Sequence, residues 1–187
     1  RVRHVNGNGI VIGKALGGTD TALQRLADLL TAAGLAVTVS SRIQREVWFK
    51  LWGNMTMNPI SALTGAPCDR ILDDPLVRGF CSAVMLEAQA VGAAFGIPIE
   101  QRPEERHAVT RKLGSFRTSM LQDAAAGRPL EIDALVGAVR EIGWPLNPCF
   151  QLFGKNLHLV ADKNGIIDLC VCKRTGKCQM IVVAFVA

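Results

Sequence analysis

The chain has 187 residues, of which 49% are hydrophobic and 20% charged, and its formal net charge at pH 7 is +5. This length allows one sizeable core, or one domain with an appendage, and the composition excludes the disordered and fibrous classes. Lysines and arginines are scattered without a run of five or six, and aromatic residues make up only 5%. A nucleic-acid partner is therefore not expected.

Membrane association is not expected either, because no apolar run reaches the ~18 residues that a spanning helix requires. The final apolar segment, residues 180–187, has only eight. Six cysteines are too few for a disulfide scaffold, which favours a cytoplasmic location. The chain begins with Arg1 instead of methionine, so we expect a fragment or a processed product, and a lost targeting segment stays open.

Residues 1–40 are expected to be the remnant end of a nucleotide-binding α/β domain. Two short strands flank an Asn-Gly-Asn-Gly turn at 6–9. Thr19 or Asp20 then caps a helix that Gly34 ends, and a further short strand runs to residue 40. A sheet with so few strands is not stable by itself. We therefore expect the remaining strands of the sheet upstream of this chain.

Residues 41–145 are expected to form an all-helical domain. Ser41 and Gln44 have the spacing of a capping box at the start of a long helix. Pro59 biases Asn58 away from helical backbone, so this helix is expected to end or kink at Asn58. Turn and capping residues then predict three further helices, at about 75–95, 104–126 and 129–143.

Residues 146–187 change character and are expected to be a divergent tail of open fold. They mix turns, short apolar runs and a group of potential metal ligands: His158, Cys170, Cys172 and Cys178. The spacing C-x-C-x5-C is not that of a usual structural zinc site, and the histidine lies twelve residues upstream. No metal is therefore expected.

The segment VWFKLWGNMTMNPISALTG, residues 47–65, is apolar but carries three polar groups on one stripe. Lys50, Asn54 and Asn58 follow at i, i+4 and i+8, and a helix places such residues on one face. Taken singly, the lysine would extend its amine to water and an asparagine before proline would end a helix. One cation and two amides together suit a small oxygen-rich anion, and a lysine there can protonate a developing alkoxide.

A second group of polar residues lies in SMLQDAAAGRPLEID, residues 119–133. Ser119 is expected near the end of one helix and Glu131 in the first turn of the next, where the helix dipole favours an ionised acid. The alternative is that Glu131 and Asp133 are ordinary acids at a helix start.

Together the two segments resemble a known family. W-x-K-L-x-x-N-x-x-x-N-P from Trp48, S-M-L-Q-D from Ser119 and G-R-x-x-E-I-D-A-L-x-G from Gly127 are similar to the C-terminal helical domain of ketopantoate reductase. The resemblance covers residues 1 to about 143. It implies a mainly α fold, with a helical domain of the 6-phosphogluconate-dehydrogenase-like type after remnant strands of a Rossmann-like domain.

The resemblance also implies an activity, the NADPH-dependent reduction of 2-dehydropantoate to pantoate in the biosynthesis of pantothenate and coenzyme A. Lys50 matches the catalytic lysine, which binds the ketone and supplies a proton. Glu131 matches the acid that anchors the substrate hydroxyl. Asn54 and Asn58 match substrate-side amides, and Ser119 matches a serine that meets the substrate carboxylate.

The sequence departs from the family pattern in two places. The G-x-G-x-x-G fingerprint of its cofactor domain is absent. We therefore expect NADPH to be held mostly by a domain that this chain lacks, and the chain alone to be inactive. From about residue 162 the family pattern is lost, and a frameshifted or unrelated end is one hypothesis.

Two other functions stay open. A non-catalytic helical module could bind a small acid or mediate dimerisation through apolar surfaces that another domain normally covers. A reductase for another 2-keto acid is the other alternative, because a catalytic lysine would serve any ketone. For either reductase, the expected partner is a small-molecule 2-keto acid. Whether the chain forms a homodimer is left open by the sequence.

Overall fold

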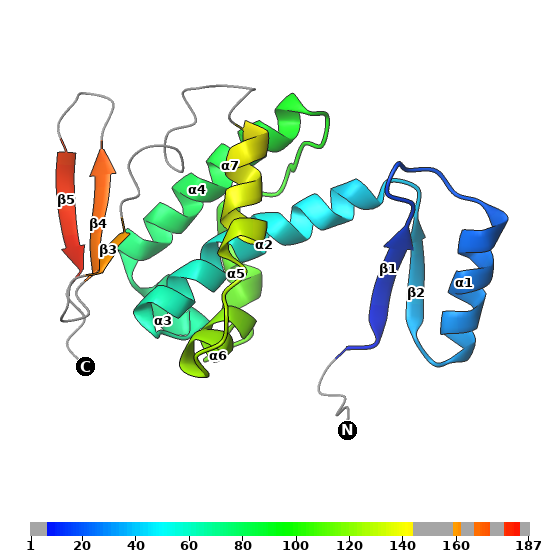
Figure 1. Cartoon of the computed structure of the whole chain (residues 1–187), viewed down its shortest axis with the longest axis horizontal. Coiled ribbons are helices and arrows are strands. Elements are labelled where there is room, and N and C mark those ends of the chain that lie inside the picture. Colours follow the sequence, from blue (N-terminus) through cyan, green and yellow to red (C-terminus); the bar gives the residue numbers. More distant parts are fainter. Residues whose placement is uncertain (1–6, 144–158, 162–166, 173–177, 184–187) are drawn as a thin grey trace. The chain divides into compact units, whose positions relative to one another are not determined.

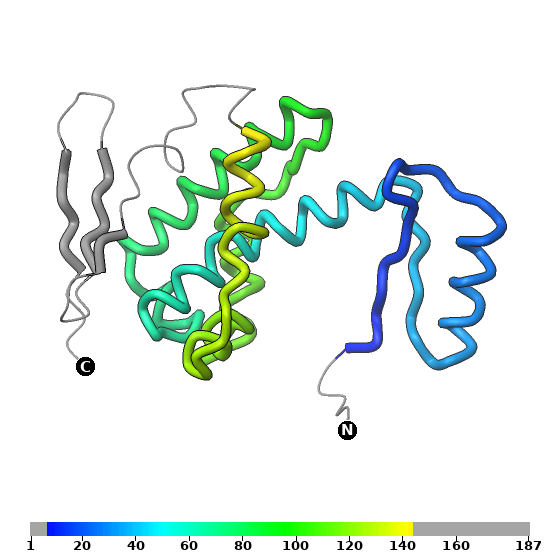
Figure 2. Tube along the Cα trace, in the orientation of Figure 1, coloured from blue at the N-terminus to red at the C-terminus, as the bar shows by residue number. Residues whose placement is uncertain are grey.

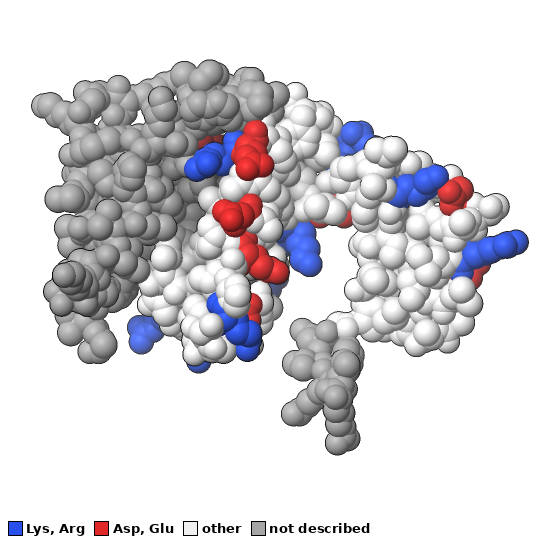
Figure 3. All heavy atoms as spheres, viewed as in Figure 1, with Lys and Arg blue, Asp and Glu red and all other residues white. Residues whose placement is uncertain are grey.

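The structure, a computed structural model, describes residues 7–143 and the backbone of residues 159–161, 167–172 and 178–183. The chain forms two compact units, Arg1–Lys50 and Leu51–Ala187, and each is described here by itself. Most of the described residues are helical, which confirms the mainly α fold class (Figure 1). On the face that Figure 3 draws, lysines and arginines stand apart from one another and form no continuous stripe.

The first unit contains a β-α-β element, which Figure 2 follows along the chain. Strand β1 (Gly9–Gly13) pairs in parallel with β2 (Ala36–Ser40), with Ile10 opposite Val37. Parallel strands require a crossover connection, and helix α1 (Thr21–Ala32) supplies it and packs on both strands. The strand expected at 2–5 lies outside the described residues.

Helix α1 begins and ends where the sequence predicts. The Asp20 side chain caps it by accepting a hydrogen bond from Leu23 N at 2.9 Å. Gly34 follows the helix with a φ of +91°, a left-handed conformation that glycine adopts without the strain of a side chain.

Helix α2 (Ile43–Thr64) continues through Pro59, so it does not end at Asn58, one of the two outcomes that we expected. Proline removes one helical hydrogen bond, but residues 52–59 are nearly all buried, and this packing holds the helix together. Side-chain hydroxyls also bond to backbone carbonyls around the proline: Ser61 Oγ donates to Asn58 O at 2.9 Å. The expected capping box also differs, because the Gln44 amide instead donates to Ala15 O at 2.5 Å.

The second unit has its core where α2 meets three further helices. These are α3 (Cys68–Asp73), α4 (Pro75–Ala94) and α5 (Pro103–Arg111), which contact one another. One cluster of buried side chains combines Met57 of α2 with Ile71 and Leu72 of α3 and Cys81 of α4. Trp52, fully buried, ties α2 to α4 through its Nε1–H, which donates to Met85 O at 2.9 Å.

The single helix expected at about 104–126 is in fact two. Helix α5 ends at Arg111, and α6 (Ser119–Ala125) starts only after a loop. Gly114 turns that loop with a φ of +62°, and Thr118 starts the second helix by accepting a hydrogen bond from Leu121 N at 3.1 Å. Ser119 therefore opens a helix, whereas we expected it near the end of one.

The helix expected from Pro129 begins later and is irregular. A π-helical segment, η1 (Asp133–Gly137), continues into α7 (Ala138–Gly143), which packs against α4. Before it, Gly127 has a φ of +64° and Arg128 is paired with Asp123, so this stretch closes α6. Glu131 therefore precedes the helix and does not lie in its first turn.

The tail contains three strands whose backbone is described. Strands β3 (Leu159–Ala161), β4 (Ile167–Cys172) and β5 (Cys178–Val183) form an antiparallel sheet in the order β3-β4-β5. The cysteine side chains and His158, which we considered as metal ligands, lie outside the described residues. Of the helices that the structure describes, none combines the length and apolar character needed to cross a lipid bilayer.

Candidate active site

Helix α2 places the three polar residues of the stripe on one face. The helix is continuous from Ile43 to Thr64, so Lys50, Asn54 and Asn58 follow one another at successive turns. Their exposure decreases along the helix: Lys50 is exposed, Asn54 is half-buried and Asn58 is buried. The helix surrounding Lys50 is less buried than its apolar sequence suggests, since Val47 is 60% exposed.

Asn58 has the environment of a binding residue. It is only 8% exposed, yet its side-chain amide makes no hydrogen bond to any residue that the structure describes. Its amide is not among the fully buried side-chain groups without a partner, so part of it reaches the surface of the helix. The amide is therefore free to donate to or accept from a ligand at this place.

A buried pair of hydroxyls connects the turn of Asn58 to the start of α6. Ser61 Oγ and Thr118 Oγ1 are hydrogen-bonded, and the two residues are 0% and 3% exposed. Since Ser61 uses its proton on Asn58 O and Thr118 accepts from Leu121 N, the Thr118 hydroxyl is left to donate to Ser61. Ser119, the next residue, is exposed and opens α6 directly after this anchored position.

Lys50 and Glu131 are less constrained. Neither the Lys50 amine nor the Glu131 carboxylate has a hydrogen-bond or ion-pair partner among the described residues, and both side chains are exposed. The backbone of Glu131 is held, because its carbonyl accepts from Leu135 N at 3.1 Å. Among the described residues, Thr118 at the start of α6 is bonded to the turn of Asn58, whereas Glu131 has no hydrogen bond or ion pair with α2.

Arg106 is a neighbour of this site that sequence reasoning missed. Its guanidinium from α5 lies against Gly53, so close that a Cβ on Gly53 would be 2.7 Å from both Nε and Nη2. Burial lowers the pKa of Arg106, but the side chain remains a cation at neutral pH. A glycine inside an otherwise apolar helix was the available clue, because it often marks a close approach.

In the turn between β1 and α1, an acidic side chain lies at the start of the helix. In a pyrophosphate site for NADPH, the backbone N–H groups at a helix start bind the phosphates. Here the Asp20 carboxylate already caps α1, and Lys14 pairs with it at 2.8 Å. The Lys14 hydrogen bond lowers the pKa of Asp20, so an ionised carboxylate paired with Lys14 occupies the start of α1.

Within the described residues, no three His, Cys, Asp or Glu side chains gather so as to hold a metal ion.

Comparison with known proteins identifies the family. Residues 42–147 match the family described as ketopantoate reductase PanE/ApbA, C terminal. The chain belongs to the ketopantoate reductase C-terminal family. The resemblance predicted from the motifs is thereby confirmed.

Individual relatives of this ketopantoate reductase domain agree in sequence and in fold. The 2-dehydropantoate 2-reductase of Mesorhizobium japonicum is 42% identical over 142 residues, which are 76% of this chain and 44% of the relative. A candidate ketopantoate reductase from Ralstonia solanacearum MolK2 is 56% identical, with a TM-score of 0.74 over 81% of this chain and 47% of that one. The 2-dehydropantoate 2-reductase of Methylococcus capsulatus is 30% identical, with a TM-score of 0.72 over 80% of this chain and 54% of that one.

The chain spans about half the length of the curated ketopantoate reductase relatives that it matches. Those relatives are enzymes, and the family is one of pyridine-nucleotide-dependent reductases.

Proposed function

We propose that residues 41–145 are the substrate-binding and catalytic domain of an NADPH-dependent 2-dehydropantoate 2-reductase. The observation that carries this proposal is the polar face of α2 in a member of this family: an exposed lysine, a half-buried amide and a buried, unpartnered amide at successive turns. The substrate is a small 2-keto acid that bears a hydroxyl.

Lys50 acts as the proton donor in this proposal. Reduction of the ketone places negative charge on its oxygen, and an ammonium group beside that oxygen stabilises the charge and then gives up a proton. Lys50 is suited to this because it is exposed and no described residue holds its amine.

The remaining polar groups orient the substrate. The amides of Asn54 and Asn58 can each donate and accept, so they can bind the ketone side of the molecule. Ser119, fixed next to Thr118, donates to the substrate carboxylate, and Glu131 accepts from the substrate hydroxyl. The Arg106 cation beside Gly53 adds positive charge to the surroundings of an anionic substrate.

We further propose that this polypeptide does not turn over by itself. Its described β-α-β element has an acid-capped helix where a phosphate-binding turn would need free N–H groups. NADPH, the proposed hydride source, would therefore have to be held mostly by residues other than those of the described β-α-β element.

Pantoate binding tests the site without a cofactor. We expect the chain to bind pantoate, followed by NMR titration at constant ionic strength, and Asn58→Ala to weaken binding about tenfold. Asn8→Ala, an exposed asparagine in the first unit, is the matched control and should change nothing. Equal binding by both variants would contradict the placement of the substrate on α2.

Turnover tests the role of Lys50. The chain mixed with NADPH and 2-dehydropantoate should show no activity, whereas a chimera that joins it to the cofactor-binding half of the Mesorhizobium japonicum relative should be active. In that chimera Lys50→Ala should lower kcat by about 10²–10⁴, and Lys112→Ala, another exposed lysine, should not. An active chimera that tolerates Lys50→Ala would refute the assignment.

A further inference from the structure

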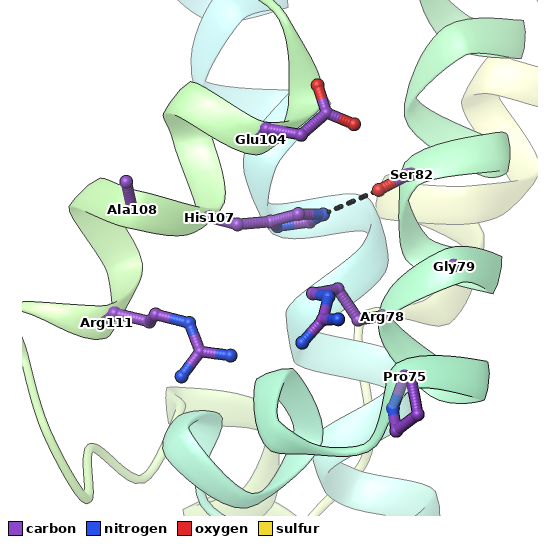
Figure 4. A pocket seen from close by; sticks show the side chains of 8 residues that line it. All are labelled: Pro75, Arg78, Gly79, Ser82, Glu104, His107, Ala108 and Arg111. Carbon is purple, nitrogen blue, oxygen red and sulfur yellow. Dashed lines mark hydrogen bonds between the residues drawn. The ribbon is translucent and has the colours of Figure 1, made fainter.

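The second unit contains a pocket to which none of the proposed catalytic residues belongs. It has a volume of about 470 Å³, within the ~300–1,000 Å³ range of small-molecule sites. Its walls are the first half of α4 and the length of α5, as Figure 4 shows. The lining residues are Pro75, Arg78, Gly79, Ser82, Glu104, His107, Ala108 and Arg111.

Two guanidinium groups occupy one end of this pocket. Arg78 Nη1 donates to Leu72 O at 2.7 Å, and Arg111 Nη2 donates to the same carbonyl at 2.5 Å. Arg111 also pairs with Asp73 at 2.6 Å. These bonds fix both cations in position before any ligand arrives, which lowers the entropy cost of binding.

The arginines keep most of their hydrogen-bonding capacity. A guanidinium has five N–H groups; Arg78 uses one of them and Arg111 two on described residues. The hydrogen bonds to the Leu72 carbonyl and to Asp73 therefore use only part of the N–H donors of the two arginines. The remaining donors are available to an oxygen-rich ligand.

A serine and a histidine lie next to the two arginines in the pocket. Ser82 Oγ and His107 Nε2 are 3.0 Å apart across the pocket, and the histidine is 4% exposed (Figure 4). Burial lowers the pKa of His107, and the nearby cations Arg78 and Arg111 lower it further. The carboxylate of Glu104 acts in the opposite direction, but the net pKa is lowered. The ring is therefore neutral at pH 7 and leaves the two guanidiniums as the cations of the pocket.

The charges are separated along the pocket. In Figure 4 His107 lies between Glu104 on one side and both arginines on the other. Asp73 neutralises Arg111, but Arg78 has no carboxylate partner among the described residues. The arginine end is thus electropositive, and guanidinium groups bind phosphate oxygens in pairs of parallel hydrogen bonds.

We propose that this pocket binds the phosphate group of a small molecule. Arg78 and Arg111 donate to the phosphate oxygens, and Ser82 donates its hydroxyl when His107 Nε2–H is the donor of the bond between them. The apolar surfaces of Pro75 and Ala108 lie against the rest of the ligand. The proposal is independent of the reductase function, because it uses neither α2 nor Ser119 nor Glu131.

Inorganic phosphate is the probe for this site. The full 187-residue chain, with ¹⁵N-labelled arginine side chains, is titrated with phosphate against chloride at constant ionic strength. We expect the Arg78 and Arg111 side-chain resonances to shift with saturation. Arg78→Gln should weaken binding about tenfold, the loss of a charge-assisted hydrogen bond, whereas Arg70→Gln, an exposed arginine on α3 outside the pocket, should leave it unchanged.

A variant expected to tighten binding protects the test from folding artefacts. Glu104→Gln removes a repelling carboxylate from the pocket and should tighten phosphate binding about threefold. Glu105→Gln, on the same helix turn but outside the pocket, should not. Equal effects of the paired variants, absence of saturation, or the same shifts with acetate as with phosphate would each overturn the proposal.

Discussion

The hydrogen bond between Ser61 and Thr118 predicts a specific energetic coupling between α2 and α6. Ser61→Ala would remove the acceptor of a buried hydroxyl, since Thr118 is only 3% exposed. A buried donor left without a partner costs about 1–3 kcal/mol of unfolding free energy. We expect about 1.5 kcal/mol, because the cavity left by one hydroxyl is small.

Thr118→Ala should cost more, because Thr118 also caps α6 through Leu121 N. Loss of an N-cap costs about 1 kcal/mol and loss of the bond to Ser61 about another 1, so we expect about 2 kcal/mol. Thr118→Ser keeps both hydrogen bonds and loses a methyl group, so it should cost less than about 1 kcal/mol. The double alanine variant removes the shared bond once, and its cost should fall below the sum by about 1 kcal/mol.

Urea unfolding at equilibrium measures these differences. Trp48 and Trp52, two of the chain's three tryptophans, are buried in α2, so tryptophan fluorescence reports on the affected region. Thr110→Ala is the control: its hydroxyl bonds only within α5, to Arg106 O at 3.2 Å, and its cost should add to that of Ser61→Ala. Costs of Ser61→Ala and Thr118→Ala that add within about 0.3 kcal/mol would refute the coupling.

Three further predictions follow from single positions. Gly79→Ala, with no atom within 4 Å of the new Cβ, should stabilise the chain by about 1 kcal/mol in the same urea assay, because alanine favours helix. Gly53→Ala should stabilise it less, because its Cβ would lie 2.7 Å from Arg106 Nε and Nη2 and the guanidinium would have to move aside. Burial raises the pKa of the Cys81 thiol to about 12, so iodoacetamide at pH 8 should modify it only after unfolding, as mass spectrometry would reveal; rapid native labelling would contradict this. Burial lowers the pKa of His107 below its ordinary 6.5, so the unfolded chain binds the proton more tightly and stability should decrease as pH falls below 6.5. His107→Gln should flatten that decrease in unfolding measured from pH 7 to pH 5.

The sequence was most informative where a local rule decides the structure. Asp20, one of the two expected caps, does start α1, and the helix expected at about 75–95 begins at Pro75 with Asp74 as its cap. Helical spacing alone was enough to align Lys50 with the two asparagines of α2. Capping and periodicity depend on near neighbours in the chain, so tertiary packing had little to change.

Errors arose where packing outweighed such rules. Pro59 predicts a helix end, yet burial of α2 keeps the helix intact around it. Gly114 breaks a stretch that composition alone makes helical. The contact of Arg106 with Gly53 joins residues 53 positions apart, and no spacing rule reaches that far.

The carbonyl of Leu72 is a main-chain atom, and this affects how the arginine pair can change during evolution. Any residue at position 72 presents the same oxygen, so substitutions there leave the anchor for Arg78 and Arg111 in place. The position of the two cations depends instead on where α3 ends and on the identity of two residues, Arg78 in α4 and Arg111 in α5. An insertion or deletion of a single residue in the short junction at Asp74 would separate the cations more effectively than most substitutions.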